Sequence, residues 1–557
     1  MEIIFLPFNK KIAAERGITL QKAAFDLGID TGAVCGGKKT CGKCKVLVSK
    51  GNDRIFSAEE NRILTEEEKD MGVRLACCFY PSSDTCAIID TGHEEDGKEK
   101  VKEERKEKAR EKTKAEVKEE RKRKTIEQVK KESGNDEQGK IPSADILYEG
   151  IYGVVIDIGT TNLEGVLYNR KLGIPIVTKG ISNPQKMYGA DVVSRITYAL
   201  EESENNLKLQ KAVREAIISL IEELGSQAGI SLHRIDRAVL SGNTTMTNLF
   251  LGRSLKGLSR APFQSESYKG DFLSPKEAGL NINPEGMVYV LPGISGHVGG
   301  DALACILSKE MQKESQKILL LDIGTNAELI LCDGHKLIAC SVAAGPAFEG
   351  GNISCGMRAE AGAIISARYY EDSLKVEFMA EKGRDSYPKG ICGSGLIECI
   401  YELYKNGKID ETGRLLGRAG EENLYRIWEN AGKEISITQK DIREFQLAQG
   451  AIGAGTAMLL TKAGLEPENL DKVYLAGNFG GKISIKKAIA LGLLPLVPEE
   501  NIEYIGNGAL KGGAKVLMEE ITPEETEKIS QQVEHIELAL EPDFGELFIK
   551  AMTFPPR

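Results

Sequence analysis

Two segments of the sequence place an aspartate, a glycine and hydroxyl or amide side chains directly after an apolar run. They are residues 153–162, GVVIDIGTTN, and residues 318–329, ILLLDIGTNAEL. Each pattern is typical of a buried strand that turns tightly into a second strand, and the glycine lets the backbone approach a ligand closely. Amides and hydroxyls of such a turn can bind phosphate oxygens, and the aspartate can hold hydrated Mg²⁺. The sequence therefore predicts two phosphate-binding hairpins.

The repetition of this pattern indicates a duplicated domain whose halves face each other across one site. Residues 296–304 (GHVGGDALA) and 506–514 (GNGALKGGA) are predicted to be glycine turns that open helices. Residues 473–481 (VYLAGNFGG) are predicted to be an apolar strand that ends in a turn where a flat base can lie against the backbone. Each glycine alone fits an ordinary turn, but the ordered set favours a nucleotide site.

The cysteines are concentrated near the N-terminus, where six of the twelve fall between Cys35 and Cys86. Three lie in the glycine-rich loop 35–44, CGGKKTCGKC, and a fourth thiol comes from the distant segment 74–78, RLACC. Such a cluster is more typical of a metal site than of a disulfide framework in a protein that shows no secretory signal. Four thiolates without a nearby histidine suit an iron–sulfur cluster. A zinc site with four cysteines is the alternative.

Residues 1–91 resemble ferredoxins of the [2Fe–2S] β-grasp type, in which a loop gives three ligands and a distant Leu-Ala-Cys segment gives the fourth. The resemblance implies that the cluster ligands are Cys35, Cys41, Cys44 and Cys77. Cys78 is the alternative to Cys77 as the fourth ligand. Cys78 and Cys86 are otherwise expected to be thiols that bind no metal.

A highly charged segment, residues 92–145, separates this module from the rest of the chain. It is almost entirely Glu, Lys and Arg, with pairs such as Glu104–Lys108 at a spacing that supports a helix. It has no apolar stripe, so a coiled coil is excluded. We expect either a single solvated helix or a disordered tether that lets the redox module move between partners. The expected division is 1–91 ferredoxin module, 92–145 linker, 146–545 nucleotide-binding domain and 546–557 C-terminal tail.

Composition excludes several classes of function. The formal net charge is −10, which argues against a nucleic-acid binder, because such a protein carries a basic surface. No apolar run approaches the roughly 20 residues that a membrane span needs. The N-terminus, MEIIF, lacks the basic start of a secretory signal. We therefore expect a cytoplasmic protein.

The order of two phosphate hairpins, two connecting helices and a base-binding turn resembles the superfamily of acetate and sugar kinases, heat-shock chaperones and actin. The resemblance implies an α/β multidomain protein with two RNase H-like lobes and with ATP and Mg²⁺ in the cleft between them. It implies catalytic roles for Asp157, Asp301 and Asp322, with Asp301 orienting water or metal. The nucleotide-binding residues implied are Gly159, Thr160, Thr161, Gly324, Thr325, Asn326, Gly477, Asn478, Phe479 and Gly480.

Together with residues 345–350 (GPAFEG) and 391–395 (ICGSG), the whole chain outside the linker resembles reductive activators of corrinoid-dependent methyltransferases. The resemblance implies an ATPase that passes an electron from its [2Fe–2S] cluster to Co(II) of a corrinoid protein, which restores Co(I) for methyl transfer. It also implies a low-potential donor protein or reductase. Some relatives carry an extra domain after the tether that is reduced or absent here, so a homodimer is left open.

Three other functions compete with this interpretation. The first is an ATP-coupled activator of another low-potential metalloenzyme, although that class usually lacks a fused ferredoxin module. The second is a small-molecule kinase joined to a ferredoxin, which would make a phosphorylated product. The third is a nucleotide switch without catalysis, in which loss of the Asp157 carboxylate would leave ATP turnover unchanged.

The cysteine pattern generates a direct test. Cys41→Ala removes one of four predicted ligands, so the purified variant should lose the iron chromophore and bound iron. Cys86→Ser should keep both, because Cys86 is not a predicted ligand. Visible absorption and iron analysis measure the result. An intact chromophore in Cys41→Ala, or zinc without iron in the unmodified protein, would contradict the prediction.

Overall fold

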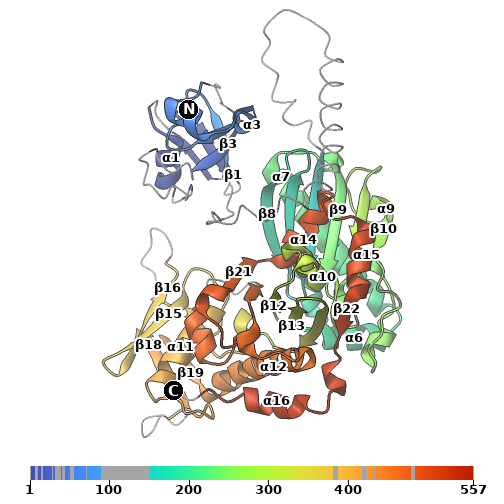
Figure 1. Ribbon diagram of the computed structural model, residues 1–557, viewed down its shortest axis with the longest axis vertical. Helices are drawn as coiled ribbons and strands as arrows, with labels where there is room; N and C mark the ends of the chain where they lie inside the picture. Colours follow the sequence, from blue (N-terminus) through green and yellow to red (C-terminus); the bar gives the residue numbers. More distant parts are fainter. Residues whose placement is uncertain are drawn as a thin grey trace, which may run out of the picture. The chain divides into compact units, whose positions relative to one another are not determined.

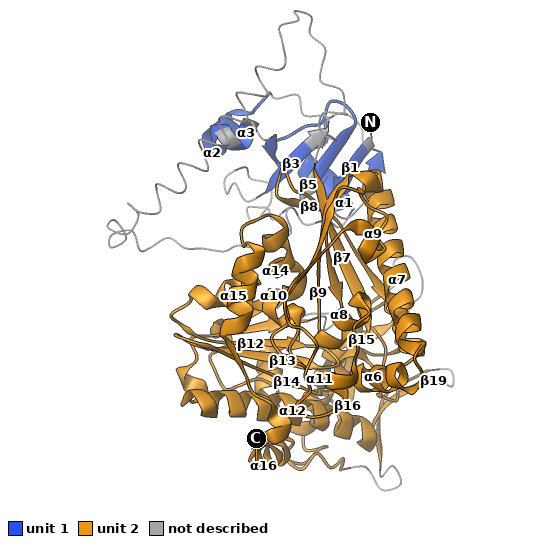
Figure 2. Ribbon diagram, turned by 90° about the vertical axis from the view of Figure 1, so that its right-hand side faces the viewer, with its two compact units in different colours: residues 1–150 blue, residues 151–557 orange. Residues whose placement is uncertain are grey.

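The computed structural model of the chain describes residues 2–6, 10–13, 17–27, 29, 31, 39, 44–50, 55–70, 72–89, 151–380, 387–416, 423–430, 433–477 and 483–555. The predicted linker, residues 92–145, lies outside the described residues, so its conformation stays a prediction. The chain divides into two compact units, Met1–Gly150 and Ile151–Arg557, which are coloured separately in Figure 2. Among the described helices, none is both long and apolar enough to cross a membrane.

The first unit is built on a five-stranded sheet with the order β2-β1-β5-β3-β4. Strand β1 pairs with β5 in parallel, and the other neighbours are antiparallel. Its elements are β1 (Glu2–Leu6), β2 (Lys10–Ala13), α1 (Leu20–Asp26), β3 (Lys45–Lys50), α2 (Ala58–Ile63), α3 (Glu66–Asp70), β4 (Val73–Leu75) and β5 (Thr85–Ile89). This mixed sheet confirms the predicted β-grasp module.

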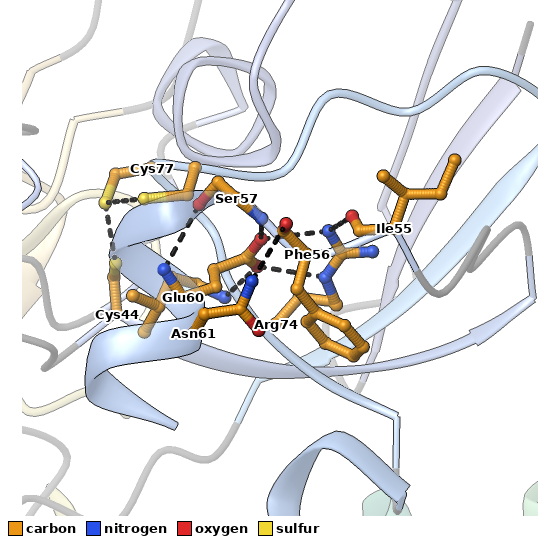
Figure 3. A network of polar contacts seen from close by, with 10 residues as sticks. Cys44, Ile55, Phe56, Ser57, Glu60, Asn61, Arg74 and Cys77 are labelled. Atoms are coloured by element: carbon orange, nitrogen blue, oxygen red, sulfur yellow. Dashed lines mark hydrogen bonds and ion pairs between the residues drawn. The ribbon is translucent and has the colours of Figure 1, made fainter. Parts of the chain in front are cut away.

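A buried ion pair joins helix α2 to strand β4 in this unit (Figure 3). The Arg74 guanidinium donates from Nε to Glu60 Oε1 at 2.9 Å and from Nη2 to Glu60 Oε2 at 3.0 Å. Glu60 also accepts from the amide of Leu75, and Arg74 stacks against Phe79, with the guanidinium carbon 4.1 Å from the ring centroid. Burial opposes ionisation of Glu60, but the donors from Arg74 and the backbone lower the pKa of its carboxyl.

The second unit contains two six-stranded sheets that share the order of five strands and carry the sixth strand, β10 or β22, at opposite edges. The first is β10-β11-β9-β6-β7-β8 and the second is β21-β20-β12-β13-β14-β22. In both, an antiparallel three-stranded meander is followed by two parallel strands, which is the RNase H-like pattern that the superfamily resemblance implied. The strands are β6 (Tyr152–Ile158), β7 (Asn162–Asn169), β8 (Ile174–Ser182), β9 (Ile235–Gly242), β10 (Asp271–Leu273), β11 (Met287–Val290), β12 (Lys317–Ile323), β13 (Ala327–Asp333), β14 (Leu337–Val342), β20 (Lys472–Ala476), β21 (Ile502–Gly506) and β22 (Val533–His535).

Strands β6 and β12 begin the two predicted phosphate hairpins and lie at the centre of their sheets. Almost all of their residues are buried, which explains their continuous apolar runs. Helices pack around both sheets (Figure 1). The helices are α6 (Val192–Glu201), α7 (Asn205–Ala228), α8 (Thr244–Leu251), α9 (Pro275–Ala278), α10 (Gly300–Lys309), α11 (Gly393–Lys405), α12 (Gln439–Ala463), α13 (Ile485–Ala490), α14 (Gly508–Leu517), α15 (Pro523–Gln532) and α16 (Phe544–Ala551).

Helices α10 and α14 lie side by side between the two sheets (Figure 1). Glycines permit this close approach. A Cβ atom at Gly508 would lie 2.6 Å from Cys305 Sγ, and a Cβ at Gly512 would overlap the carbonyl oxygen of Ala304. The two helices therefore form a shared core with Val155 of the first sheet and Leu320 of the second.

An insertion in the second lobe adds two small sheets. They contain β15 (Ala363–Tyr370), β16 (Ser373–Phe378) and β17 (Gly390–Ile391), and β18 (Leu424–Asn430) and β19 (Lys433–Thr438). Lys487 ties α13 to α11 through Glu398 and Glu402, each with a separation of 2.8 Å. The segment expected as a tail, 546–557, includes most of α16, which lies alongside α12, and Phe554 is buried in the core.

The ion pair of Figure 3 generates a stability prediction. Glu60→Ala leaves the Arg74 guanidinium buried without its carboxylate, so the unfolding free energy of the first unit should fall by about 3–5 kcal/mol. Glu66→Ala removes an exposed i,i+3 partner of Lys69 and should cost under about 0.5 kcal/mol. Chemical denaturation of the full chain, followed by the visible signal of the predicted iron–sulfur chromophore, measures both. Equal midpoints for the two variants would contradict the expected difference.

Candidate functional site

The tips of the two hairpins enclose one pocket in the second unit. It is lined by both hairpins, by the start of α10, by the segment around Glu349 and by the residue before α14. The predicted residues found in this lining are Asp157, Gly159, Thr160, Thr161, Asp301, Asp322, Gly324, Thr325, Asn326 and Gly477. The three predicted carboxylates, from two strands and one helix, thus reach a common cavity.

The hairpins of the two lobes touch each other at their tips. The hydroxyls of Thr161 and Thr325 lie 3.1 Å apart, and the Thr325 hydroxyl also donates to Glu349 Oε1 at 2.9 Å. Within the first turn a Cβ at Gly159 would lie 2.5 Å from the carbonyl oxygen of Asn162, so the tight turn requires glycine. A ligand held by both turns would therefore bridge the lobes.

Each hairpin carries a second carboxylate directly opposite its aspartate. Asp157 pairs in register with Glu164 on β7, and Asp322 pairs with Glu328 on β13. Both glutamates line the pocket, and neither was selected from the sequence. The signal was present, because a glutamate follows each turn two residues after its asparagine, in Asn162-Leu163-Glu164 and Asn326-Ala327-Glu328.

Burial raises the pKa of four carboxyl groups that line this pocket. The pKa of Asp157 rises well above its ordinary value through burial and the neighbouring Asp301, Glu164 and Asp322, although Asn507 donates to it. Burial raises the pKa of Asp301 to about 7, with Asp322 adding to the effect. Asp322 and Glu328 shift in the same direction for the same reason. The pocket therefore favours a cation.

The described residues that line this pocket include carboxylates and amides but no lysine or arginine. An anionic polyphosphate would be repelled unless a cation accompanied it. Oxygen donors of this kind suit Mg²⁺, which usually keeps several waters and binds through one or two carboxylates together with substrate phosphates. No three His, Cys, Asp or Glu side chains in the described part of the chain converge on a single ion. The donor set thus fits a hydrated ion better than an all-protein cage.

A fully buried arginine supports the first hairpin from behind. Arg195 of α6 donates from Nη2 to the carbonyl of Thr160 at 2.7 Å and from Nε to that of Gly189 at 2.9 Å. Asn183 donates to the carbonyl of Gly159 at 2.9 Å. Burial lowers the pKa of Arg195 to about 10, so it keeps its charge near neutral pH. The carbonyl of Gly189 thus helps to fix the arginine that supports the hairpin.

The ends of strands β9 and β20 occupy equivalent places in the two lobes. A Cβ at Gly242 would lie 2.7 Å from the carbonyl oxygen of Ile158, and a Cβ at Gly477 would overlap that of Ile323. Asn243, which follows Gly242, donates to the Thr160 hydroxyl at 3.0 Å and lines the pocket. Asn243 was not among the site residues predicted from the sequence. The predicted base-binding residues Asn478, Phe479 and Gly480 lie outside the described residues.

In the first unit, two of the four predicted cluster ligands can be placed. The sulfurs of Cys44 and Cys77 are buried and lie 3.3 Å apart, and Cys78 lies 3.7 Å from Cys77 (Figure 3). Burial and the neighbouring thiols raise the pKa of Cys77, so a thiolate there needs a metal centre for compensation. This donor pair fits an iron–sulfur cluster. Cys35 and Cys41 lie outside the described residues, so their role stays a prediction.

The structure also locates the two glycine-bearing motifs GPAFEG, residues 345–350, and ICGSG, residues 391–395. Glu349 of the GPAFEG segment lines the pocket, whereas Cys392 of the ICGSG segment is buried and donates to the carbonyl of Ile364 at 3.1 Å. The first motif therefore contributes to the pocket between the two hairpins. The second begins α11 and packs in the core of the second lobe, because a Cβ at Gly393 would overlap the carbonyl oxygen of Phe348.

Family models match almost all of the described chain. A model for the 2Fe–2S iron–sulfur cluster binding domain matches residues 5–82. The RACo middle region matches residues 152–314, and the C-terminal domain of RACo, its ASKHA domain, matches residues 316–557. Fold, site and models together define a [2Fe–2S] ferredoxin module joined to a nucleotide-binding ATPase of the actin and sugar-kinase class.

The similar proteins narrow this class to one family. The corrinoid activation enzyme RamQ of Eubacterium limosum is 34% identical over 423 residues, which is 72% of this chain and 70% of the relative. The [Co(II) methylated amine-specific corrinoid protein] reductase of Methanosarcina barkeri is 26% identical, covering 72% and 77%. A solved reductive activator for corrinoid, iron–sulfur protein shares 30% identity with a TM-score of 0.68, over 100% of this chain and 98% of that one. The chain belongs to the family of reductive activators of corrinoid proteins.

The raised pKa of Asp301 predicts a pH dependence of stability in metal-free, nucleotide-free protein. The folded state retains a proton at Asp301 between pH 3.8 and about 7 that the unfolded state loses. The unfolding free energy contributed by this group therefore decreases as pH rises through that window. Asn does not titrate, so Asp301→Asn avoids this decrease. The Tm of the variant minus the Tm of the unmodified protein should therefore increase by a few degrees between about pH 5 and about pH 8.

Differential scanning calorimetry in the presence of a chelator measures this Tm difference. Glu468→Gln serves as the control, because Glu468 is exposed and does not line the pocket, and its Tm difference should stay constant with pH. A Tm difference for Asp301→Asn that also stayed constant with pH would show that Asp301 has no raised pKa.

Proposed function

We propose that this protein is an ATP-dependent reductive activator, which passes one electron from its [2Fe–2S] cluster to Co(II) of a corrinoid protein. The reduced cluster is oxidised by one electron, Co(II) becomes Co(I), and ATP and water become ADP and phosphate. The observation that carries the proposal is the joining of a buried cysteine site to a two-lobed nucleotide pocket in one chain of this family. The restored Co(I) state is the one that accepts a methyl group.

The first unit prepares the electron donor. When bound, the cluster supplies one electron at a low potential. We propose Cys35, Cys41, Cys44 and Cys77 as its ligands, supported by the 3.3 Å approach of the Cys44 and Cys77 sulfurs. The Arg74–Glu60 pair fixes strand β4, and Cys77 follows that strand within three residues of Arg74. This rigid attachment would hold the fourth ligand in place while the redox state changes.

The second unit binds the nucleotide. We propose that Gly159, Thr160, Thr161, Gly324, Thr325 and Asn326 contact phosphate oxygens, since these turns face one pocket. Asp157, Asp301 and Asp322 would hold hydrated Mg²⁺ and orient the attacking water, because their carboxylates share the same cavity. Gly477, with Asn478, Phe479 and Gly480, is proposed to line the adenosine pocket. Positioning and charge neutralisation are the main requirements of phosphoryl transfer.

Contact between the hairpins offers a route from ATP to a change of shape. Thr161 of one lobe meets Thr325 of the other at 3.1 Å, so phosphates that enter between the two turns must separate or reorient them. Closure of two lobes around a ligand is a common means of coupling binding to motion. We propose that this motion makes the uphill reduction of Co(II) possible by changing contacts with the corrinoid protein.

The remaining assignments are also proposals. A low-potential protein or reductase would reload the cluster after each transfer, and a cytoplasmic location is proposed because its reducing conditions keep cysteine ligands available for a metal centre. The segment 92–145 would serve as the linker between the ferredoxin module, 1–91, and the nucleotide-binding domain, which begins near residue 146. A homodimer is the assembly to test first, by light scattering of the purified protein.

The central experiment mixes chemically reduced protein with Mg·ATP and a Co(II) corrinoid protein from the same organism. We expect the Co(I) absorption to appear only when ATP is present. Asp157→Ala should lower ATP turnover and Co(I) formation on the order of 10²-fold, because a carboxylate of the cation site is lost. Glu468→Ala, an exposed change outside the pocket, should behave as the unmodified protein.

The outcomes separate the competing functions. Failure of every corrinoid protein of the organism to reach Co(I) would count against corrinoid activation and favour another metalloenzyme target. A phosphorylated small molecule in place of inorganic phosphate would identify a kinase. ATP turnover that is unchanged in Asp157→Ala would leave this carboxylate without a catalytic role.

A further inference from the structure

Each hairpin aspartate is held by a donor from the connecting helix of the opposite lobe. Helix α14 follows the second sheet, but its capping residue Asn507 donates to Asp157 of the first lobe at 2.9 Å. Helix α10 follows the first sheet, but its Cys305 thiol donates to Asp322 of the second lobe at 3.3 Å. The exchange is reciprocal, so the position of each aspartate depends on both lobes.

Asn507 makes the stronger of these two contacts and bridges two carboxylates at once. Its Nδ2 amide donates to Asp157 Oδ2 and to Glu164 Oε2, each at 2.9 Å. Its Oδ1 accepts from the amide of Leu510, which caps helix α14. All the hydrogen-bonding atoms of this side-chain amide are therefore used, and its orientation is fixed by three partners.

The packing of helix α14 links this bridge to the relative position of the two lobes. A Cβ at Gly513 would lie 2.5 Å from Val155 Cγ1 of strand β6, and a Cβ at Gly508 would lie 2.6 Å from Cys305 Sγ of α10. Helix α14 thus packs closely against both the first sheet and α10. Because Asn507 caps this helix, a shift of the helix would move Asn507 relative to Asp157. Lobe motion and carboxylate geometry are mechanically connected at this residue.

We propose that Asn507 is a positioning residue of the nucleotide site, which fixes the carboxylates of Asp157 and Glu164 in one geometry and links that geometry to the position of helix α14. The inference rests on the proposed function, because it concerns the same Mg·ATP site. Residues that orient the ligands of a metal, without touching the metal, commonly change its affinity by about 10–100-fold when they are replaced. Asn507 acts in this way.

Helix capping alone is the competing explanation, and the chain offers a clean separation of the two roles. Asn507→Ser keeps an N-cap oxygen for the Leu510 amide but removes the amide that bridges the carboxylates. Thr522→Ala removes the N-cap of α15, a helix of the same length whose capping residue does not line the pocket. The first variant tests the bridge, and the second tests the cost of a lost cap.

The experiment titrates Mg²⁺ into full-length protein that holds the non-hydrolysable analogue AMPPNP, by isothermal titration calorimetry. ATP turnover is measured separately as kcat and KM. For Asn507→Ser we expect Mg²⁺ affinity to fall about tenfold and kcat to fall by a similar factor, with KM for ATP nearly unchanged. Thr522→Ala should lower Tm without changing Mg²⁺ affinity.

Each result decides the inference. If Asn507→Ser folds and binds Mg²⁺ as the unmodified protein does, Asn507 is only a capping residue and the proposal is overturned. If the variant fails to fold, Asn507→Asp keeps the cap oxygens and provides the second variant for the same titration, and unchanged Mg²⁺ affinity there overturns the proposal as well. If the unmodified protein binds no Mg·AMPPNP, the proposed function itself fails, which is a different result from a defect confined to Asn507.

Discussion

The close packing of α10 against α14 is the constraint on which the nucleotide site depends. The helices come from different lobes and meet through glycines, because a Cβ at Gly508 or Gly512 would collide with Cys305 or Ala304. This contact brings Asn507 to the first hairpin and the Cys305 thiol to the second. The two lobes therefore build one site together. Each lobe supplies an aspartate, and the donor that orients this aspartate comes from the other lobe.

The electrostatics of the pocket explain why cation and nucleotide are expected to bind together. Four carboxyl groups of the pocket have raised pKa values because partial or full burial disfavours their charged forms, and they are those of Asp157, Asp301, Asp322 and Glu328. A divalent cation would reverse that penalty and offset the phosphate charge in the same step. The guanidinium of Arg195 donates to the carbonyl of Thr160 in the first turn and does not line the cavity. We therefore propose that phosphate oxygens are held in this site through a metal ion and backbone dipoles.

The ferredoxin module solves a different problem, which is to hold a redox cofactor in a small domain with a limited core. A buried Arg74–Glu60 pair, which contacts the backbone as well as the aromatic rings of Phe56 and Phe79, fixes the strand before Cys77. Replacing one partner leaves a buried charge unpaired, so this polar network couples the stability of the module to the placement of Cys77, the proposed fourth ligand. Electron transfer and nucleotide binding therefore rest on separate cores, consistent with the division of the chain into two units.

The sequence alone determined the features that depend on local chemistry. Both hairpins, the cysteine pattern and the two-lobed fold followed from short motifs and their order, because turn geometry and ligand chemistry constrain residue types within a few positions. Tertiary structure alone decided that Asn507 and Arg195 reach the first hairpin, and that residues 546–551 of the expected tail belong to α16, which lies against α12. These contacts join residues up to 350 positions apart, as Asn507 and Asp157 are. Strand register and helix packing set such distances, and no local pattern in a single sequence records them.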